Sequence, residues 1–553
     1  MTKQFAEDIR YFVSKKIYIL IVFLAAAFSY GFQVTHVAVG IDDTATSLYF
    51  EEGLAPAVGR WTLYIINRLF HLSDFTPWMT DLAGVLLLIF AAMIWCVLLR
   101  RIIGDEISLL GYTFFAALFV TCPLISEVYV YYLHNGIGVG YVFSAFSLLL
   151  VQRALEKDKN IKMCCLNLLS ATFLLAAAMG CYESFAIVYA IGALLLFIAH
   201  RIGPETFRKA RYSKNVWRWG GFVGGPLVAS AFMRMIMITL IYRIFGLSIP
   251  DNYNSVELRS AFSFFSGNLN ELAMYFKRFW VKYYLNGLVY LPIAVLVFGI
   301  SLLLLVCIVY GVKKRDIFLP LAAVAIPILP VLMIFVEGKE SYYRASQYVP
   351  LVGAFGVFLM FWIGQALFPK WMKRVGVLLA AALLWNQCAD MNRWFYVDYL
   401  KYEYFKNVML TVANDLESDF DLSKPVIFGG ACEVPYPIMK DACVDFSSPQ
   451  YKMIRALGDI VDEHLIEKYN EKGGRGYIFA ETPTFSTLQW GVTAFDGTAG
   501  EIQKFLNMLG YEIPIVRDLQ KIEDAGKKRR GDMPHFPQEG YIQEYEGCLI
   551  VNF

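Results

Sequence analysis

The sequence is poor in charged residues: only 17% of its 553 residues are Asp, Glu, Lys or Arg, whereas 58% are hydrophobic. Soluble domains carry roughly 25% charged residues, so this composition excludes an ordinary soluble protein and indicates a chain that crosses a membrane several times. A net charge of +2 and the lack of a long basic tract give no indication of nucleic-acid binding. The first apolar run is too long for a signal peptide and lacks a small-residue cleavage site, so we expect a retained span.

Metal-binding patterns are scarce as well. The chain has ten Cys and six His, and they form no CxxC pair or Cys/His cluster of the metal-binding type. Asp42, Asp43, Glu127 and Glu183 could share a hard cation, but nothing in their spacing requires one. We therefore expect no metal and no other cofactor, although a divalent cation is not excluded. No internal repeat is visible, which disfavours a transporter built from inverted repeats.

Long apolar runs organise the first two thirds of the chain. A membrane-spanning helix needs roughly 20 apolar residues, and about eleven runs approach that length. The expected spans cover residues 17–39, 79–99, 107–127, 136–151, 163–180, 184–200, 219–242, 287–311, 317–336, 349–368 and 375–391. The sequence thus predicts a polytopic α-helical membrane domain over residues 1–391.

The charge of the loops predicts the orientation of this domain. Basic residues gather before the first span and in alternate loops after it, and such loops face the cytoplasm. We therefore expect a plasma-membrane protein with a cytoplasmic N-terminus, and we place the large loops 40–78 and 243–286 outside. In the first of these loops Ile65 and Leu69 are four residues apart, and Trp61 shares their face with Tyr64. This spacing is typical of a helix that lies in the membrane interface.

The composition changes after residue 392, where charged residues become frequent. Residues 426–428 and 477–479 are typical of short buried strands, and residues 450–470 and 500–509 have the apolar spacing of helices. We therefore predict a small α/β domain over 392–553. An odd number of spans places this domain outside the cell, whereas it would lie inside if the short last span, 375–391, does not cross the membrane.

Two motifs lie on the outer side of the predicted membrane domain. The stretch Ile41-Asp42-Asp43-Thr44-Ala45 follows the first span, and Gly59-Arg60-Trp61 follows it in the same loop. Adjacent carboxylates at a membrane boundary are costly to desolvate, so simple anchoring does not explain them.

With these motifs and about nine or ten further spans, residues 10–390 resemble the type II O-antigen glucosyltransferases of bacteria and their phages, within the GT-C superfamily. The resemblance implies a GT-C-like fold and an inverting enzyme that passes a sugar, expected to be glucose, from polyprenyl phosphate to a hydroxyl of a surface glycan outside the membrane. Of the family's functional residues, only the acid of the first loop carries over, onto Asp42 or Asp43.

Glycosyl transfer from a lipid phosphate needs a base on the acceptor hydroxyl and cations near the departing phosphate. Asp42 or Asp43 can supply the base, with Asp42 as our first choice, although a solvated loop pair or a helix cap would also explain them. Expected substrate contacts are the outer-side residues Arg60, Glu127, Glu183, Arg234, Lys339 and Arg344.

These substrate-binding residues have different roles in the predicted mechanism. Arg344 is our first choice for the phosphate because tyrosines flank it, and Arg234 stands out because it lies inside an apolar span. Glu127 and Glu183 lie near tyrosines, a combination that suits sugar hydroxyls and ring faces. Surface solvation, snorkelling and helix capping are the alternative explanations for these side chains.

Two other functions fit the composition. A transporter or flippase of lipid-linked glycan would need charges along the depth of several spans, and Arg234 is the only clear case. A scaffolding membrane protein would bind wall glycan through its outer domain. The expected outer clustering of the Asp42–Asp43 pair with Glu183 and Arg344 favours the enzyme.

Overall fold

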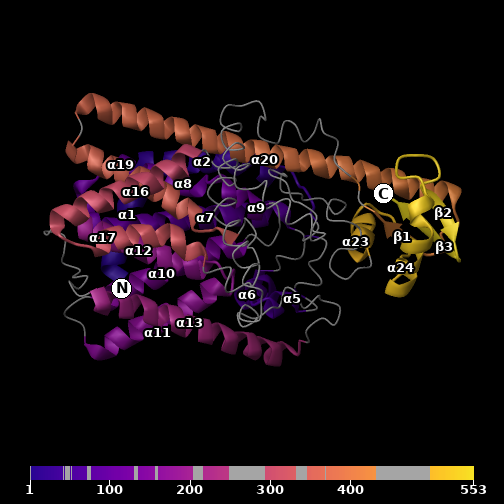
Figure 1. The fold of residues 1–553 in the computed structure, drawn as a ribbon, viewed down its shortest axis with the longest axis horizontal. Coiled ribbons are helices and arrows are strands. Elements are labelled where there is room, and N and C mark those ends of the chain that lie inside the picture. Colours follow the sequence, from indigo (N-terminus) through magenta and orange to yellow (C-terminus); the bar gives the residue numbers. More distant parts are fainter. Residues whose placement is uncertain are drawn as a thin grey trace.

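The computed structural model describes residues 2–40, 43, 50, 53–70, 76–129, 135–155, 160–203, 216–247, 293–331, 345–367, 369–430, 432 and 499–553. Within these ranges a bundle of helices makes up most of the molecule (Figure 1). A small sheet with accompanying helices lies beyond one end of the bundle, and the N-terminus lies toward the other end.

Apolar helices form the bundle. Six helices in the described ranges are long and apolar enough to cross a membrane: α2 (Lys16–Thr35), α7 (Pro77–Ile103), α10 (Asn135–Ala154), α11 (Ile161–Met179), α12 (Phe185–Ile202) and α13 (Val216–Phe245). The other apolar helices are α8 (Leu109–Val120), α16 (Ile293–Lys314), α17 (Phe318–Ile328) and α19 (Val349–Leu367). These helices confirm a helical membrane protein. Every expected span overlaps one of them or α20 within the described residues, while the number that cross the membrane stays a prediction.

The expected span 107–127 is interrupted near its end. Helix α8 ends at Val120, and the chain continues as the 3-10 turn η2 (Pro123–Ile125) and the short helix α9 (Ser126–Tyr129). Pro123 explains the break, because its ring disfavours helical geometry in the residue before it and it has no N–H to donate. Glu127 therefore lies in a separate short helix after the span.

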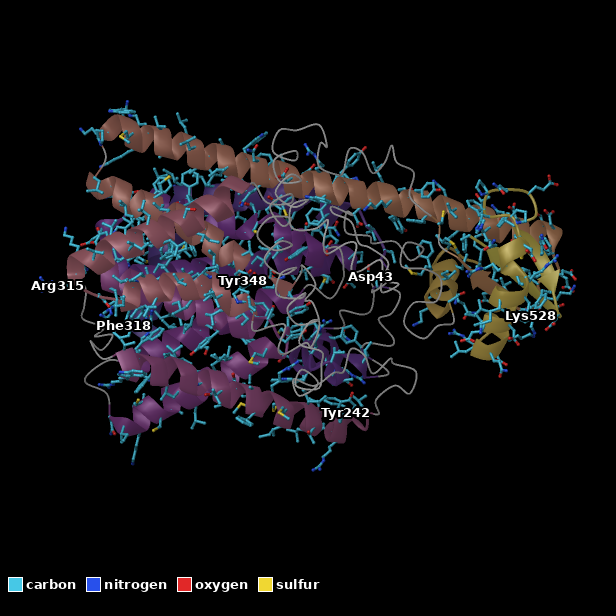
Figure 2. The ribbon with its side chains drawn as sticks, viewed as in Figure 1. Asp43, Tyr242, Arg315, Phe318, Tyr348 and Lys528 are labelled. Carbon is cyan, nitrogen blue, oxygen red and sulfur yellow. The ribbon has the colours of Figure 1, made fainter. Side chains whose placement is uncertain are left out.

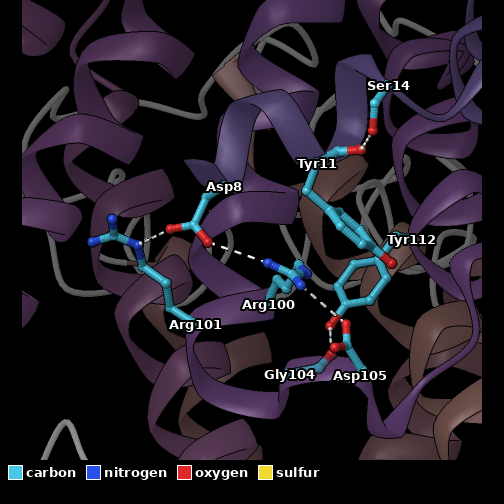
Figure 3. Close-up of polar contacts among 8 residues, drawn as sticks. All are labelled: Asp8, Tyr11, Ser14, Arg100, Arg101, Gly104, Asp105 and Tyr112. Atoms are coloured by element: carbon cyan, nitrogen blue, oxygen red, sulfur yellow. Dashed lines mark hydrogen bonds and ion pairs between the residues drawn. The ribbon is translucent and has the colours of Figure 1, made fainter. Parts of the chain in front are cut away.

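A network of ion pairs ties α1 (Thr2–Val13) to the end of α7 (Figure 3). The Asp8 carboxylate is 3.2 Å from Nη1 of Arg100 and 2.9 Å from Nε of Arg101. Arg100 also reaches Asp105 at 3.1 Å and lies over the Tyr11 ring, 3.7 Å from its centroid. Asp8 and both arginines are largely buried, and an unpaired buried charge would be costly. The ion pairs give each of these charges a partner of opposite sign.

The two ends of the bundle differ in character. Arg315 follows α16 at the end nearer the N-terminus, whereas Asp43 and Tyr242 lie toward the opposite end (Figure 2). This arrangement agrees with the predicted separation of the basic loops from the loop that carries the acids. The side of the membrane that each end faces stays a prediction.

Helix α20 (Lys370–Asp419) has 50 residues, which corresponds to roughly 75 Å at 1.5 Å per residue. It runs along the bundle and continues to the sheet (Figure 1). Residue 392, where the composition changes, lies inside this helix. The predicted division at 391 and 392 therefore coincides with no break in the backbone, and the division into domains stays a prediction.

The sheet has three strands, β1 (Val426–Gly429), β2 (Ile542–Tyr545) and β3 (Cys548–Asn552), in the order β1-β3-β2. Strand β3 pairs in parallel with β1 and antiparallel with β2. Helices α23 (Gly500–Met508) and α24 (Leu519–Lys528) accompany the sheet. The strand expected at 426–428 and the helix expected at 500–509 are confirmed, whereas the elements expected at 450–470 and 477–479 lie outside the described residues.

We call residues 402–432 and 499–553 the C-terminal unit. Its core contains one face of α20, with Val412 and Leu416, and the buried residues Phe428, Leu549 and Val551 of the sheet. The last turns of α20 thus belong to this unit by packing, although the same helix begins beside the membrane bundle.

Candidate active site

The short helix α5 (Leu54–Ala57) and α6 (Trp61–Phe70) meet at Gly59. Gly59 has φ +86°, in the left-handed region that favours glycine. A Cβ at this position would lie only 1.8 Å from Nη2 of Arg234. Glycine is therefore needed at position 59 both for the backbone turn and for the close approach of the guanidinium.

Arg234 reaches this turn from α13. Its Nη2 donates to the carbonyl of Val58 at 3.2 Å, and its Nε donates to the carbonyl of Gly59 at 3.4 Å. Nη2 also lies 4.0 Å from a carboxylate oxygen of Glu183, and both side chains are about four-fifths buried, at 20% and 18% exposure. These contacts compensate for an arginine within an apolar helix and fix the direction of its guanidinium.

A second arginine adjoins this pair. The guanidinium carbon of Arg60 lies over the ring of Tyr182, 4.8 Å from its centroid. Arg60 directly follows Gly59, whose carbonyl accepts Nε of Arg234, so both arginines adjoin the same turn. The cluster of Arg60, Tyr182, Glu183 and Arg234 thus brings two guanidinium groups to one turn, and guanidinium groups are suited to binding an anion.

The turn between α11 and α12 holds Tyr182 and Glu183 against α6. The carbonyl of Gly180 accepts the N–H groups of Thr62 and Leu63 at 3.0 Å and 3.3 Å. A Cβ on Gly180 would lie 2.5 Å from Nε1 of Trp61, so only glycine permits this approach. The site thus depends on two glycines that bring backbone segments close together.

Helix α6 differs in detail from the interfacial helix expected there. Trp61 and Tyr64 are buried against protein, whereas Leu69 and Phe70 are each 68% exposed. The end of the helix packs on α13, with the rings of Tyr64 and Phe245 5.2 Å apart. Leu69 therefore does not share the buried face of Trp61 and Tyr64.

Asp43 is hydrogen-bonded to Gly40, which lies after the end of α2. It is 1% exposed, and its Oδ2 accepts the N–H of Gly40 at 2.7 Å. The N–H of Asp43 in turn donates to the carbonyl of Gly40 at 3.2 Å. The carboxylate is thereby fixed relative to the backbone. Its neighbour Asp42 lies outside the described residues.

The other expected contacts are only partly described. Glu127 lies in α9, but its side chain is outside the described part of the chain, as are Lys339 and Arg344. Of the expected residues, Arg60, Glu183 and Arg234 come together in one cluster. The roles of all these residues stay predictions.

Asp81 is a candidate that the sequence analysis did not single out. It lies in the first turns of α7 and is only 3% exposed. Asp81 acts electrostatically on Tyr129, whose ring is 4.8 Å from that of Tyr30 and whose carbonyl accepts Nε2 of Gln33 at 3.2 Å. The sequence signal for Asp81 was an acid inside the expected span 79–99. Hydropathy averaged over a whole apolar span conceals a single charged residue.

The described part of the site contains carboxylates and arginines. Among the residues that the structure describes, no group of three His, Cys, Asp or Glu side chains could hold a metal ion. The described side chains therefore provide acid–base groups and anion-binding groups.

The bundle of apolar helices defines an integral membrane protein, and the arginines and carboxylates at one end give it a candidate site for an anionic substrate. The family model for glucosyl transferase GtrII matches residues 31–361, more than half of the chain, so the chain belongs to this family of membrane-associated glucosyltransferases. The match confirms the resemblance to type II O-antigen glucosyltransferases. Searches of the curated proteins and of the solved structures found no match.

The matched segment includes all the expected site residues, from Asp42 to Arg344. It ends within α19, before α20 and the C-terminal unit. The family therefore accounts for a glycosyltransferase in the membrane bundle and assigns nothing to the C-terminal unit.

Proposed function

We propose that this chain transfers glucose from polyprenyl phosphate to a hydroxyl of a cell-surface glycan, on the non-cytoplasmic side of the membrane and with inversion at the anomeric carbon. The observation that carries the proposal is the cluster of Arg60, Glu183 and Arg234 at the turn between α5 and α6, two helices that lie toward the same end of the bundle as Asp43 (Figures 1 and 2). This cluster suits a phosphate group that a lipid holds at the membrane surface.

The proposed reaction is a single displacement. The acceptor oxygen forms a bond to the anomeric carbon, a carboxylate takes the acceptor proton, and the bond between that carbon and the phosphate oxygen breaks. The electron pair leaves with polyprenyl phosphate, whose negative charge increases. Attack from the face opposite the leaving group inverts the anomeric configuration.

Arg60 and Arg234 would stabilise the charge that grows on the departing phosphate. Such groups accelerate transfer when they act more strongly on the transition state than on the bound donor. Glu183 orients the Arg234 guanidinium, and Tyr182 supports the plane of Arg60. Arg344 and Lys339 remain proposed as further phosphate contacts, and Glu127 remains proposed as a sugar contact.

Asp43 is the better-supported member of the pair for the role of base. Its carboxylate is buried and held by the Gly40 N–H, which keeps it in one orientation. Asp42 remains the alternative. We further propose that the N-terminus lies in the cytoplasm and the C-terminal unit outside.

The experiment measures donor binding and transfer separately in purified protein, with polyprenyl-phosphate-glucose as donor. Asp43→Asn keeps an oxygen that can accept the Gly40 N–H, so the turn is retained while the basicity is lost. Transfer should fall by about 10²- to 10⁴-fold, the usual contribution of a general base, with donor affinity unchanged.

Asp105→Asn is the control. Asp105 is an exposed acid in the 3-10 turn η1 (Gly104–Glu106), which follows α7 at the end of the bundle away from Asp43. Full activity in Asp43→Asn would assign the base to Asp42. Full activity in both Asp43→Asn and Asp42→Asn would refute the mechanism. A flippase, the alternative function, would move the lipid-linked sugar without consuming it in this assay.

A further inference from the structure

We propose that the C-terminal unit positions the base of the membrane enzyme: Val39 is seated in the core of that unit and, through Gly40, holds the carboxylate of Asp43. This inference rests on the proposed function, in which Asp43 takes the acceptor proton. It gives a role to a part of the chain that the family match does not cover.

The end of α2 is fixed to α20 by aromatic contacts. His36 stacks on Phe32 with ring centroids 4.0 Å apart, and Tyr399 of α20 packs edge-on against His36 at 5.2 Å. Tyr396 packs edge-on against Phe32 at 5.6 Å. Such edge-on and stacked arrangements are favourable geometries for aromatic rings, so α20 determines where the chain leaves α2.

The chain continues from His36 to Val39, and the Val39 side chain lies in the core of the C-terminal unit. It is 3% exposed and belongs to the apolar cluster that contains Phe405, Val412, Phe428 and Leu549. Every other residue of that cluster lies at position 402 or later. Val39 is therefore the one residue that the N-terminal part of the described chain contributes to this core.

The next peptide group connects Val39 to the acid. The Val39–Gly40 peptide is planar and carries the Gly40 N–H, which donates to Oδ2 of Asp43 at 2.7 Å. A change in the seating of Val39 therefore rotates the N–H that holds the carboxylate. The Gly40 carbonyl, which accepts the Asp43 N–H at 3.2 Å, moves with it.

This connection makes Val39 a positioning residue. It lies in an apolar core, so it has no chemical part in the transfer. Loosening it should misplace the acid and slow turnover, while the arginine cluster and donor binding are unaffected. A loss of stability in the C-terminal unit alone predicts no such separation.

The test compares Val39→Ala with Val412→Ala in the full-length protein. Val412 is 0% exposed in the same core, and the same two methyl groups are removed there. Both variants should lose thermal stability. Only Val39→Ala should lower kcat, by about tenfold or more, because a misplacement of about 1 Å can cost about a hundredfold.

Two further results separate this inference from the proposed function. Adding Val39→Ala to Asp43→Asn should cause no further fall, because the misplaced group is already inactive. Equal loss of kcat in Val39→Ala and Val412→Ala would overturn the positioning role while the base assignment stands. Full activity in Asp43→Asn would instead overturn the base assignment.

If Val39→Ala does not fold, Val39→Thr replaces it, with Val412→Thr as control. Threonine keeps the shape of valine but places a hydroxyl in the apolar core. Val39→Thr should lower kcat with donor affinity unchanged, and Val412→Thr should leave kcat close to that of the natural protein. A normal kcat in Val39→Thr, with the core destabilised, would refute the proposal.

Discussion

Replacement of Gly59 by Ala should displace Arg234 and slow transfer by roughly a hundredfold. The new Cβ would lie 1.8 Å from Nη2 and 2.5 Å from Cζ of Arg234. The guanidinium must retreat by about 1.5 Å or more to reach ordinary van der Waals separation. It then loses its bonds to Val58 and Gly59, and a misplacement of about 1 Å can cost about a hundredfold in rate.

Gly53→Ala is a closely matched control. Gly53 has φ +85°, almost the same as Gly59, but the nearest neighbour of its added Cβ would be the side chain of Leu247 at 3.3 Å. Both substitutions place alanine in the left-handed region, at a cost of about 1–2 kcal/mol. The two variants should therefore lose similar thermal stability, while only Gly59→Ala displaces Arg234.

The assay determines kcat and donor affinity for both purified variants. Equal loss of turnover in Gly53→Ala would assign the effect to backbone strain. Normal turnover in Gly59→Ala would show that the observed position of Arg234 is not needed. The double variant Gly59→Ala/Arg234→Ala should be no slower than Arg234→Ala alone, because the displaced group is then absent.

Three more predictions concern Arg234, the buried acid Asp398 of α20, and the orientation of the bundle. Arg234→Lys should retain only part of the activity seen in kinetic assays, because lysine cannot bind two carbonyls and a carboxylate with a planar fork. Burial raises the pKa of the Asp398 carboxyl, and the positive charge of Lys401 lowers it by a smaller amount. The folded protein thus retains a proton that the unfolded chain releases near pH 4, so stability should fall as the pH rises above about 4. Asp398→Asn should flatten this dependence in thermal unfolding. In a background without reactive native cysteines, Thr76→Cys should be labelled only from outside and Lys313→Cys only from inside, and the reverse pattern would overturn the proposed orientation.

Hydropathy and turn chemistry predicted much of the bundle and part of the site. The apolar helices coincide with the expected spans because lipid and protein interiors both require apolar side chains. Arg234 was identified by its charge within such a run, and Glu183 by its place in a tight turn. Their contact could not be predicted, because it depends on how closely α6 approaches α13 at Gly59.

The continuity of α20 was missed for a physical reason. Composition reports the surroundings of a helix, and α20 leaves an apolar environment near residue 392 without a break in its backbone hydrogen bonding. The polar turns after that point therefore indicated a new domain. Val39 was equally hidden, because one valine at the end of an apolar span does not reveal that it packs against residues more than 360 positions away.

The strand order of the small sheet has a consequence for biosynthesis. Strand β3 lies between β1 and β2, although it follows both of them in the chain. The ribosome must therefore synthesise residues up to Asn552 before β1 can pair with β3, by which time the bundle helices have already been synthesised. A nascent chain that stalls before Cys548 would contain the whole bundle but would lack the strand that completes the core around Val39. If Val39 positions Asp43 as proposed, the placement of that acid therefore depends on the synthesis of β3.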